Sequence, residues 1–181
     1  MKATANLEND HVSILKLCDV MEKITLEEKI NFNHIEEIVI IIRNFADGLH
    51  HKKEEEFLFP KMSEKGFPLD SGPLAVMLND HEAGRSYVRG IAESISAYKT
   101  GGTTEQKLIY ANFAAYVDLL RNHIGKENNV LFRMADNSFS DKEQQALLAE
   151  FINADKTGMG SGNAADFVSR IENLAKIYNI E

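Results

Sequence analysis

The stretch HHKKEEEFLFP, at residues 50–60, decides the fold, and its pattern returns as HIGKENNVLF at residues 123–132. The two copies share a histidine, a lysine, a glutamate and a Leu-Phe pair at the same places, so each contains His-x-x-x-Glu followed by an apolar pair. Residues four apart lie on one face of a helix, so each copy directs an imidazole and a carboxylate the same way. Two such faces meeting in a bundle core would surround two metal ions with nitrogen and oxygen ligands. The repeat therefore predicts a dinuclear metal site.

The composition is that of one globular domain. The chain has 181 residues, 44% of them hydrophobic and 27% charged, which is enough apolar sequence for a single core. A net charge of −8 without a basic stripe argues against a nucleic-acid partner. The lone Cys18 cannot form an intrachain disulfide, and the longest apolar run, residues 38–42, is too short to cross a membrane. With no apolar signal region at the N-terminus, we expect a cytoplasmic protein with no membrane partner.

An all-α fold is favoured, because proline is rare and strand-like alternation is scarce. Asn33 and Glu36 form the expected capping pair of a second helix, and Thr103 or Thr104 the start of a fourth. Apolar residues recur at helical spacing over four stretches, at about residues 7–24, 33–62, 73–100 and 103–137. We expect residues 1–137 to form an up-down-up-down antiparallel four-helix bundle.

The pattern changes in residues 138–181. Ser140 with Glu143 predicts a capping box for a helix that reaches Ile152. Three glycines then form a link to a last amphipathic helix at about residues 164–178. We expect these residues to be a helical appendage packed on the bundle, which acts as a lid or as the contact of a homodimer.

Antiparallel connections bring the candidate ligands to one level of the bundle. Single histidines lie near the start of the first and third helices, and the two His-x-x-x-Glu pairs lie near the end of the second and fourth. Randomly placed histidines would not coincide in this way. The predicted metal ligands are His11, His50, Glu54, His81, His123 and Glu127.

These residues also have ordinary interpretations, as a solvated glutamate or a core histidine held by a hydrogen bond. Glu127 lies on the apolar line of its helix, where burying an unpaired carboxylate costs roughly several kcal/mol unless a cation is bound. The prediction that Glu54 is also a metal ligand rests on its match to Glu127 in the second copy. The apolar stripe and the match with the second copy favour His50 over His51, which we place on the surface or in support of the site. Whether His51 or Glu55 takes part in the site is left open.

Four imidazoles and two carboxylates suit iron chiefly, with manganese or zinc as alternatives. A thiolate set is lacking, so an iron–sulfur cluster or a structural zinc is not expected. Two bridging carboxylates and four terminal histidines give each ion three protein ligands. The remaining positions are open to an oxo or hydroxo bridge, O2, NO or peroxide. No residue is assigned a catalytic role.

The same residues resemble the hemerythrin-like (HHE cation-binding) family over about residues 7–135. The matching pieces are Asp10-His11, His50-x-x-x-Glu54-Glu55-x-x-Leu58-Phe59-Pro60, Asn79-Asp80-His81-Glu82 and His123-x-x-x-Glu127. The resemblance implies a four-helix bundle with a non-haem di-iron centre held by the six residues named above.

Two positions differ from the oxygen-carrying hemerythrins. Those proteins have a second histidine one turn after the third-helix ligand, where this chain has Arg85, and an aspartate where it has Asn128. A set of four histidines and two glutamates looks more like the branch involved in nitric-oxide and oxidative stress response and in iron–sulfur cluster repair. That branch typically carries a further Cys-bearing N-terminal domain, which this sequence does not include.

Three hypotheses follow. The first is a non-haem di-iron protein that binds O2 or NO for sensing, storage or stress response. The second is an enzyme of nitrosative or oxidative stress defence, which turns over peroxide or NO or donates iron for iron–sulfur cluster repair. The third is a metal-free bundle that acts through its tail, for which His123→Ala would change neither stability nor metal content.

Overall fold

The computed structural model describes residues 2–100, 106–160 and 162–181, and all regular structure in these ranges is helical. The one pairing of extended backbone among them is an isolated bridge between Met159 and Gly162. The predicted all-α class is confirmed. The predicted start of the fourth long helix at Thr103 or Thr104 lies outside the described residues.

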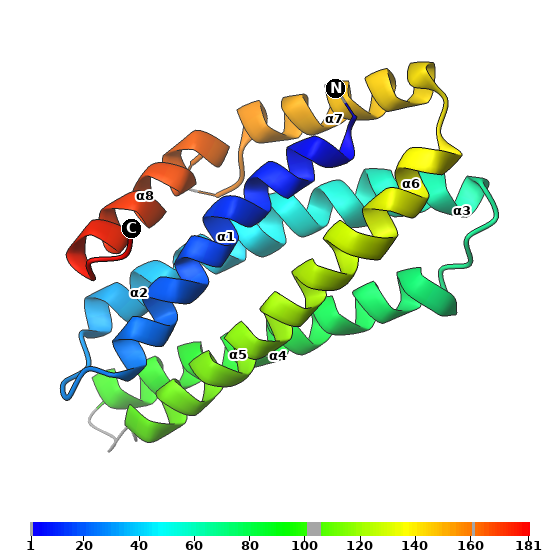
Figure 1. Cartoon of the computed structure of the whole chain (residues 1–181). Coiled ribbons are helices and arrows are strands. Elements are labelled where there is room, and N and C mark those ends of the chain that lie inside the picture. The colour runs from blue at the N-terminus through cyan, green and yellow to red at the C-terminus, as the bar shows by residue number, and fades with distance from the viewer. Residues whose placement is uncertain (1, 101–105, 161) are drawn as a thin grey trace.

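Four long helical rods are followed by two further helices (Figure 1). The second rod runs from α2 through two π-helical segments, η1 and η2, into α3, and the fourth runs from α5 through the π-helical η3 into α6. The bounds are α1 Thr4–Thr25, α2 Phe32–Ile41, η1 Ile42–His51, η2 Lys53–Leu58, α3 Phe59–Glu64, α4 Gly72–Lys99, α5 Gln106–Lys126, η3 Glu127–Leu131, α6 Phe132–Ser138, α7 Asp141–Thr157 and α8 Ala164–Ile177.

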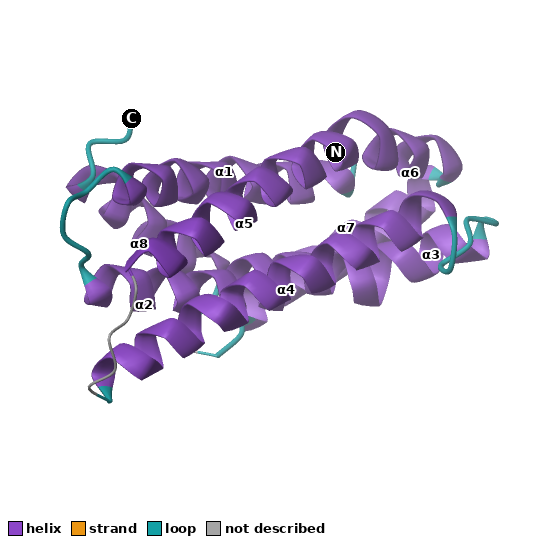
Figure 2. Ribbon diagram, turned by 90° about the horizontal axis from the view of Figure 1, so that it is seen from below, coloured by secondary structure: helices purple, strands orange, loops and turns teal. Residues whose placement is uncertain are grey.

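The rods lie alongside one another, with α4 against α5 and α1 between α5 and α8 (Figures 1 and 2). Their buried apolar residues form two clusters. Along α1, Leu7 belongs to one cluster and Ile14 to the other, and His11 lies between them. The same order holds on α4, where His81 separates Met77 from Val88. A polar layer therefore crosses the bundle between two apolar clusters.

The second rod differs from the prediction at both ends. Asn31, not Asn33 with Glu36, caps its start, because the Asn31 side chain accepts hydrogen bonds from the backbone N–H groups of the second and third helical residues. At the other end the rod passes through Pro60 and continues to Glu64. Proline is tolerated there because it lies in the first turn of α3, directly after a π-helical segment.

The tail forms two helices that begin with capping boxes. The predicted box of Ser140 and Glu143 is confirmed, and Asn163 with Asp166 forms a second one. α7 extends beyond the predicted end at Ile152 to Thr157, where Gly158 adopts a positive φ of 74°. α7 packs against η2 and α1, and α8 packs against α1 and α2.

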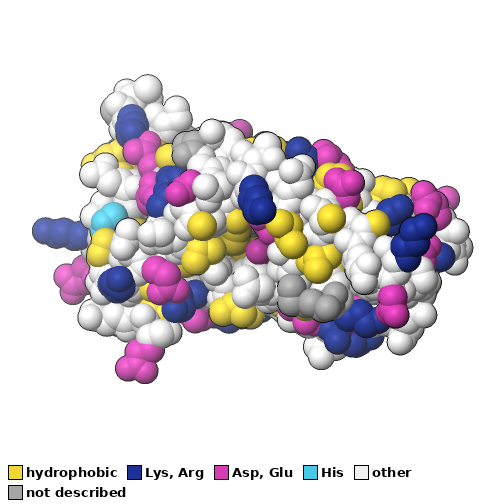
Figure 3. Space-filling view, turned by 90° about the horizontal axis from the view of Figure 1, so that it is seen from above, with side chains coloured by type: hydrophobic (Ala, Val, Ile, Leu, Met, Phe, Trp, Pro, Cys, Tyr) yellow, Lys and Arg dark blue, Asp and Glu magenta, His cyan; other side chains and the backbone are white. Residues whose placement is uncertain are grey.

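The surface carries charges of both signs. On the face shown in Figure 3, acidic and basic side chains are interspersed with apolar ones. Among the described helices, none combines the length and the apolar character needed to cross a membrane.

Candidate metal centre

The structure brings the six predicted ligands together inside the polar layer. Each is buried, with at most 2% of its surface exposed. They come from six elements: His11 from α1, His50 from η1, Glu54 from η2, His81 from α4, His123 from α5 and Glu127 from η3. Residues up to 116 positions apart in the chain thus share one buried cluster.

The four imidazoles form two pairs. The Nε2 atoms of His11 and His50 are 3.0 Å apart, and those of His81 and His123 are 3.2 Å apart. Two ring nitrogens that face each other this closely would repel if neither carried a proton or bound a cation. Each pair is therefore a place where a cation can be held by two nitrogens.

Each glutamate reaches one histidine of each pair. The carboxylate-to-imidazole distances are 3.2 Å from Glu127 Oε2 to His11 Nε2, 3.1 Å from Glu127 Oε1 to His123 Nε2, 3.4 Å from Glu54 Oε2 to His81 Nε2 and 3.8 Å from Glu54 Oε2 to His50 Nε2. Both carboxylates consequently lie between the two imidazole pairs, which is the position of a bridging ligand.

The other nitrogen of each ring faces an oxygen atom. The contacts of Nδ1 are His11 to Asn128 Oδ1 at 2.7 Å, His50 to Asp10 Oδ2 at 3.2 Å, His81 to Glu55 Oε1 at 2.7 Å and His123 to Asp80 Oδ2 at 3.2 Å. These oxygens accept a hydrogen bond from Nδ1–H, which leaves the Nε2 lone pair for the centre. Partners of this kind orient metal-binding histidines in proteins.

The apolar ends of the two sequence copies also serve the site. Phe132 stacks on His11 with ring centroids 5.5 Å apart, and Phe59 stacks on His81 at 6.0 Å. Each Leu-Phe pair thus places its aromatic ring over a histidine of the opposite half of the chain. This contact explains why the pair follows each His-x-x-x-Glu.

The carboxylate oxygens of Glu54 and Glu127 test whether metal ions fit. All four atoms are buried, and no hydrogen-bond partner is found for any of them within the described residues. A buried carboxylate without a donor is costly. Because the facing imidazoles offer lone pairs at Nε2, cations would satisfy both sets of atoms. The donor set fits a pair of borderline metal ions.

The titration behaviour has the same cause. Burial, reinforced by the charge of Glu127, raises the pKa of Glu54 to about 7. Burial would also raise the pKa of Glu127, but His123 and His11 outweigh it and hold that pKa well below its ordinary range. Burial would lower the pKa of His81, yet Glu54 and Glu55 outweigh it and raise that pKa to about 9. Protons and metal ions therefore compete for the same lone pairs.

Of the two positions predicted for His51, the surface position is wrong, and a position in support of the site agrees with the structure. This residue is only 6% exposed, and its ring lies parallel to that of His81 with centroids 3.7 Å apart. Its Nδ1 is 3.2 Å from Asp47 Oδ1. One of its ring nitrogens lies within 4.8 Å of ligand atoms from Glu54, His81 and His123. The prediction assumed the α-helical step, whereas η1 is π-helical and turns less per residue, which keeps His50 and His51 on neighbouring faces.

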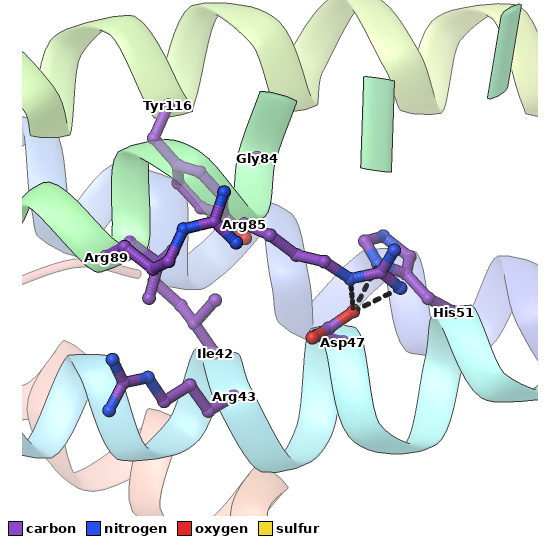
Figure 4. A pocket seen from close by; sticks show the side chains of 9 residues that line it. Ile42, Arg43, Asp47, His51, Gly84, Arg85, Arg89 and Tyr116 are labelled. Carbon is purple, nitrogen blue, oxygen red and sulfur yellow. Dashed lines mark hydrogen bonds and ion pairs between the residues drawn. The ribbon is translucent and has the colours of Figure 1, made fainter. Parts of the chain in front are cut away.

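Arg85 joins the carboxylates behind two of the histidines. Its Nε lies 2.8 Å from Asp47 Oδ1 (Figure 4). Its guanidinium is also 2.7 Å from Glu55 Oε1. Glu55 in turn contacts His81, so it supports the site from outside. His51 and Arg85 hold the pKa of Asp47 at about 2, although burial opposes this. The Arg85 guanidinium thus holds in place the two carboxylates that face the histidines, Asp47 at His51 and Glu55 at His81.

Lys53 is a functional neighbour that the sequence analysis missed. It is fully buried, and its Nζ lies 2.6 Å from Asp10 Oδ2 and 2.8 Å from Asp155 Oδ1. Its counterpart Lys126 contacts Asp80 in the same way. The signal in the sequence is the recurrence of lysine before each glutamate and of aspartate before each single histidine.

Comparisons with known proteins agree with this site. The Hemerythrin HHE cation binding domain model matches residues 2–135. An uncharacterized protein of Mycobacterium tuberculosis is 22% identical over 140 residues, which cover 77% of this chain and 54% of that protein. Iron-sulfur cluster repair protein YtfE of Edwardsiella ictaluri is 32% identical over 89 residues, and that of Salmonella newport is 34% identical over 89, covering 48% of this chain and 40% of each relative.

The chain spans about half the length or less of these curated relatives. No solved structure matches it significantly. The family model covers well over half of the chain and includes all six residues of the buried cluster. This chain therefore belongs to the hemerythrin HHE cation-binding domain family.

Proposed function

We propose that the buried cluster holds two metal ions, and that iron is the metal bound. One ion would lie between His11 and His50 and the other between His81 and His123, with Glu54 and Glu127 as bridges. The observation that carries this proposal is the set of four buried carboxylate oxygens without a hydrogen-bond partner in the described chain. Manganese and zinc share the preference for this donor set and are the alternatives.

The function we propose is reversible binding of O2 or NO, for sensing, storage or stress response. A bound metal pair would supply open coordination positions and redox chemistry to a small diatomic ligand. The chain's own residues hold the imidazoles in place through their Nδ1 contacts, and the two apolar clusters on either side keep bulk water from the centre. His51 adds an imidazole beside His81, on the side of the second ion.

The first experiment counts tightly held iron after loading with Fe(II) in the absence of air. We expect two ions per wild-type chain and a clear loss in Glu127→Ala. Glu56→Ala is the matched control, because Glu56 is an exposed glutamate on the same rod as Glu54 and its only ion pair in the described chain is with Lys52. Wild-type protein that retains no iron, zinc or manganese would refute the metal centre.

The second experiment adds O2 or NO to the loaded protein and then removes it. Reversible binding predicts an absorption change that appears with the gas and disappears without it. Wild-type protein that holds two ions but shows no change with either gas would refute this function while leaving the metal centre intact.

A second candidate function is an enzyme of nitrosative or oxidative stress defence. It is favoured by the similarity to relatives named iron-sulfur cluster repair protein. This function predicts catalytic loss of peroxide or NO, or transfer of iron to an iron–sulfur protein that lacks its cluster. Turnover that exceeds one equivalent per metal pair separates it from reversible binding.

We further infer the organisation of the chain. Residues 1–137 would form the up-down-up-down antiparallel four-helix bundle of the hemerythrin-like fold, with residues 138–181 as an appendage. The single cysteine, which is buried, suits a reducing cytoplasm. A homodimer through α8 would show a doubled mass in solution that is lost when residues 162–181 are removed.

A further inference from the structure

A cavity of about 300 Å³ lies on the outer side of His51. Three helical rods form its walls: Ile42 and Arg43 come from η1, Arg85 and Arg89 from α4, and Tyr116 from α5 (Figure 4). Its inner end is closed by His51 and by the Asp47–Arg85 ion pair, which also contacts Glu55 behind His81. A molecule in this cavity would be separated from the cluster by the single imidazole of His51.

The wall of the cavity is apolar, and its rim is cationic. Ile42, Val88 and the ring of Tyr116 supply buried apolar surface. Three arginines line the cavity against a single aspartate, in a protein whose net charge is −8.

Two of these arginines are available to a ligand. The exposed Arg43 side chain has no hydrogen bond or ion pair with any other described residue. Arg89 is 55% exposed and pairs with Glu82, which does not line the cavity. Arg43 therefore adds a positive charge to the cavity that no described acid pairs with, whereas Arg89 would exchange its exposed pairing with Glu82 for a ligand.

The internal repeat shows that the cavity is not needed to hold the histidines. Both halves repeat the same supports: Asp10 and Lys53 stand behind His50 as Asp80 and Lys126 stand behind His123. Aligned on these matches, the positions that correspond to His51, Asp47 and Arg85 are occupied by Ile124, Leu120 and Leu15. These three belong to or pack against the apolar core.

The hydrogen-bond acceptor of His11 also shows that a histidine of the site can be held without such a cavity. The side-chain oxygen of Asn128, which corresponds to Glu55, accepts the hydrogen bond of His11. The arginine beside it, Arg133, contacts the backbone carbonyl of Asn128 and not this side chain. The arginine-lined cavity is thus an addition to one half of the site. Since ordinary core packing is sufficient in the other half, the cavity requires a separate explanation.

We propose that this cavity binds a small organic carboxylate. The carboxylate would lie between Arg43 and Arg89 at the mouth, and the apolar body would pack on Ile42, Val88 and Tyr116. The volume is at the lower end of the range of small-molecule pockets, which limits the ligand to about the size of a substituted benzoate. Guanidinium groups bind carboxylates through paired charge-assisted hydrogen bonds, which makes an anion the preferred occupant.

The test uses benzoate and the full-length, metal-free protein, so that its outcome is independent of the proposed metal function. Binding is followed by calorimetry and by the NMR shift of the Gly84 amide, because Gly84 lines the cavity. Benzyl alcohol has the same apolar ring without the charge, and inorganic phosphate has charge without the ring. We expect benzoate to bind at least tenfold more tightly than either compound and to shift the Gly84 signal.

Arg43→Gln and Arg89→Gln are each expected to weaken benzoate binding about tenfold, the loss of one charge-assisted contact. Arg133→Gln, which removes an exposed arginine paired with Glu8 elsewhere on the surface, is the matched control and should leave binding unchanged. Gly84→Leu should abolish binding by filling the cavity, provided that circular dichroism shows native helicity. The two arginine variants keep the proposal testable if that variant does not fold.

Four results would overturn the proposal. Equal affinity for benzoate and benzyl alcohol would remove the role of charge, and equal affinity for phosphate would remove the role of the apolar wall. Absence of benzoate binding, or the same weakening in Arg133→Gln as in Arg89→Gln, would exclude a specific site. Failure of the metal proposal instead appears in the iron count and leaves these titrations unaffected.

Discussion

Ionisation of the buried Glu54 carboxylate lowers the stability of the metal-free protein. Its pKa is raised from 4.5 to about 7 by burial and by the charge of Glu127. An acid whose folded-state pKa is raised contributes stability below its unfolded pKa, and this stability is lost as pH rises toward the folded pKa. The metal-free protein therefore loses stability at Glu54 between about pH 4.5 and pH 7.

Glu54→Gln is expected to make the metal-free protein more stable at pH 8, by up to about 3 kcal/mol, because one pKa unit corresponds to about 1.36 kcal/mol. The gain should shrink to below about 1 kcal/mol at pH 5, where Glu54 is already protonated in the folded wild type. Urea unfolding at the two pH values measures it. The same gain at both pH values would show that Glu54 does not titrate as stated.

Cys18 should be inert in the folded protein. Burial raises the pKa of its thiol from 9.0 to about 12, which lowers the thiolate fraction at pH 8 on the order of a thousandfold. A thiol reagent at pH 8 should therefore label the protein only after unfolding in urea. Ser86→Cys adds an exposed thiol on α4 and should react at once, as a control for the reagent. Rapid labelling of native wild type would contradict the burial of Cys18.

At the scale of the helices, the π-helical segments are the feature that positions the site. The carbonyl group of Glu54 accepts a hydrogen bond from the N–H of Phe59, five residues later, and that of Glu127 accepts one from Phe132. The wider turn thus falls at the same place in both copies, between the buried glutamate and the phenylalanine that stacks on a histidine. π-helical turns in proteins are often found at functional sites.

Lys53 connects three elements, because it lies on η2 and its ammonium group meets Asp10 of α1 and Asp155 of α7. Lys53→Ala should lower the free energy of unfolding by about 3–5 kcal/mol, since it leaves the buried carboxylate of Asp10 without its cation. Lys52→Ala is the control on the neighbouring residue, whose ion pair with Glu56 is partly exposed, and it should cost less than about 1 kcal/mol. Equal effects of the two substitutions in urea unfolding would contradict this role of Lys53.

The same segments explain how far the sequence predicts the structure. The 3.6-residue period locates the long helices, and the repeat of His-x-x-x-Glu leads to the six residues that the structure brings together. The sequence leaves His51 between the surface and a supporting position, because a fixed α-helical period cannot represent a π-helical turn. The buried Lys53 is missed because a lysine is assumed to be exposed unless its partners are known, and Asp155 lies 102 residues away. The helical periodicity of the sequence thus predicts which residues form the cluster. The residues that surround the cluster depend on contacts between distant parts of the chain.

At the scale of the whole molecule, metal binding should raise the free energy of unfolding and the melting temperature. A ligand that binds only the folded state stabilises it by about 2.7 kcal/mol when its concentration is a hundred times Kd. We expect Fe(II), added without air, to raise the melting temperature of the wild type, and a chelator to reverse the change. His123→Ala should show a much smaller increase with metal. If iron, manganese and zinc all leave the melting temperature of the wild type unchanged, the result would favour the hypothesis of a metal-free bundle.

The repeated contacts of the two halves bear on the origin of the molecule. The rods α1 and α2–α3 contribute His11, His50 and Glu54, and the rods α4 and α5–α6 contribute the matching His81, His123 and Glu127. Either half paired with a copy of itself would contain the same four histidines and two glutamates. This is the arrangement that duplication and fusion of an ancestral helical hairpin produces. Once both halves are on one chain they can diverge, so that one keeps a filled core while the other acquires a hollow beside the centre.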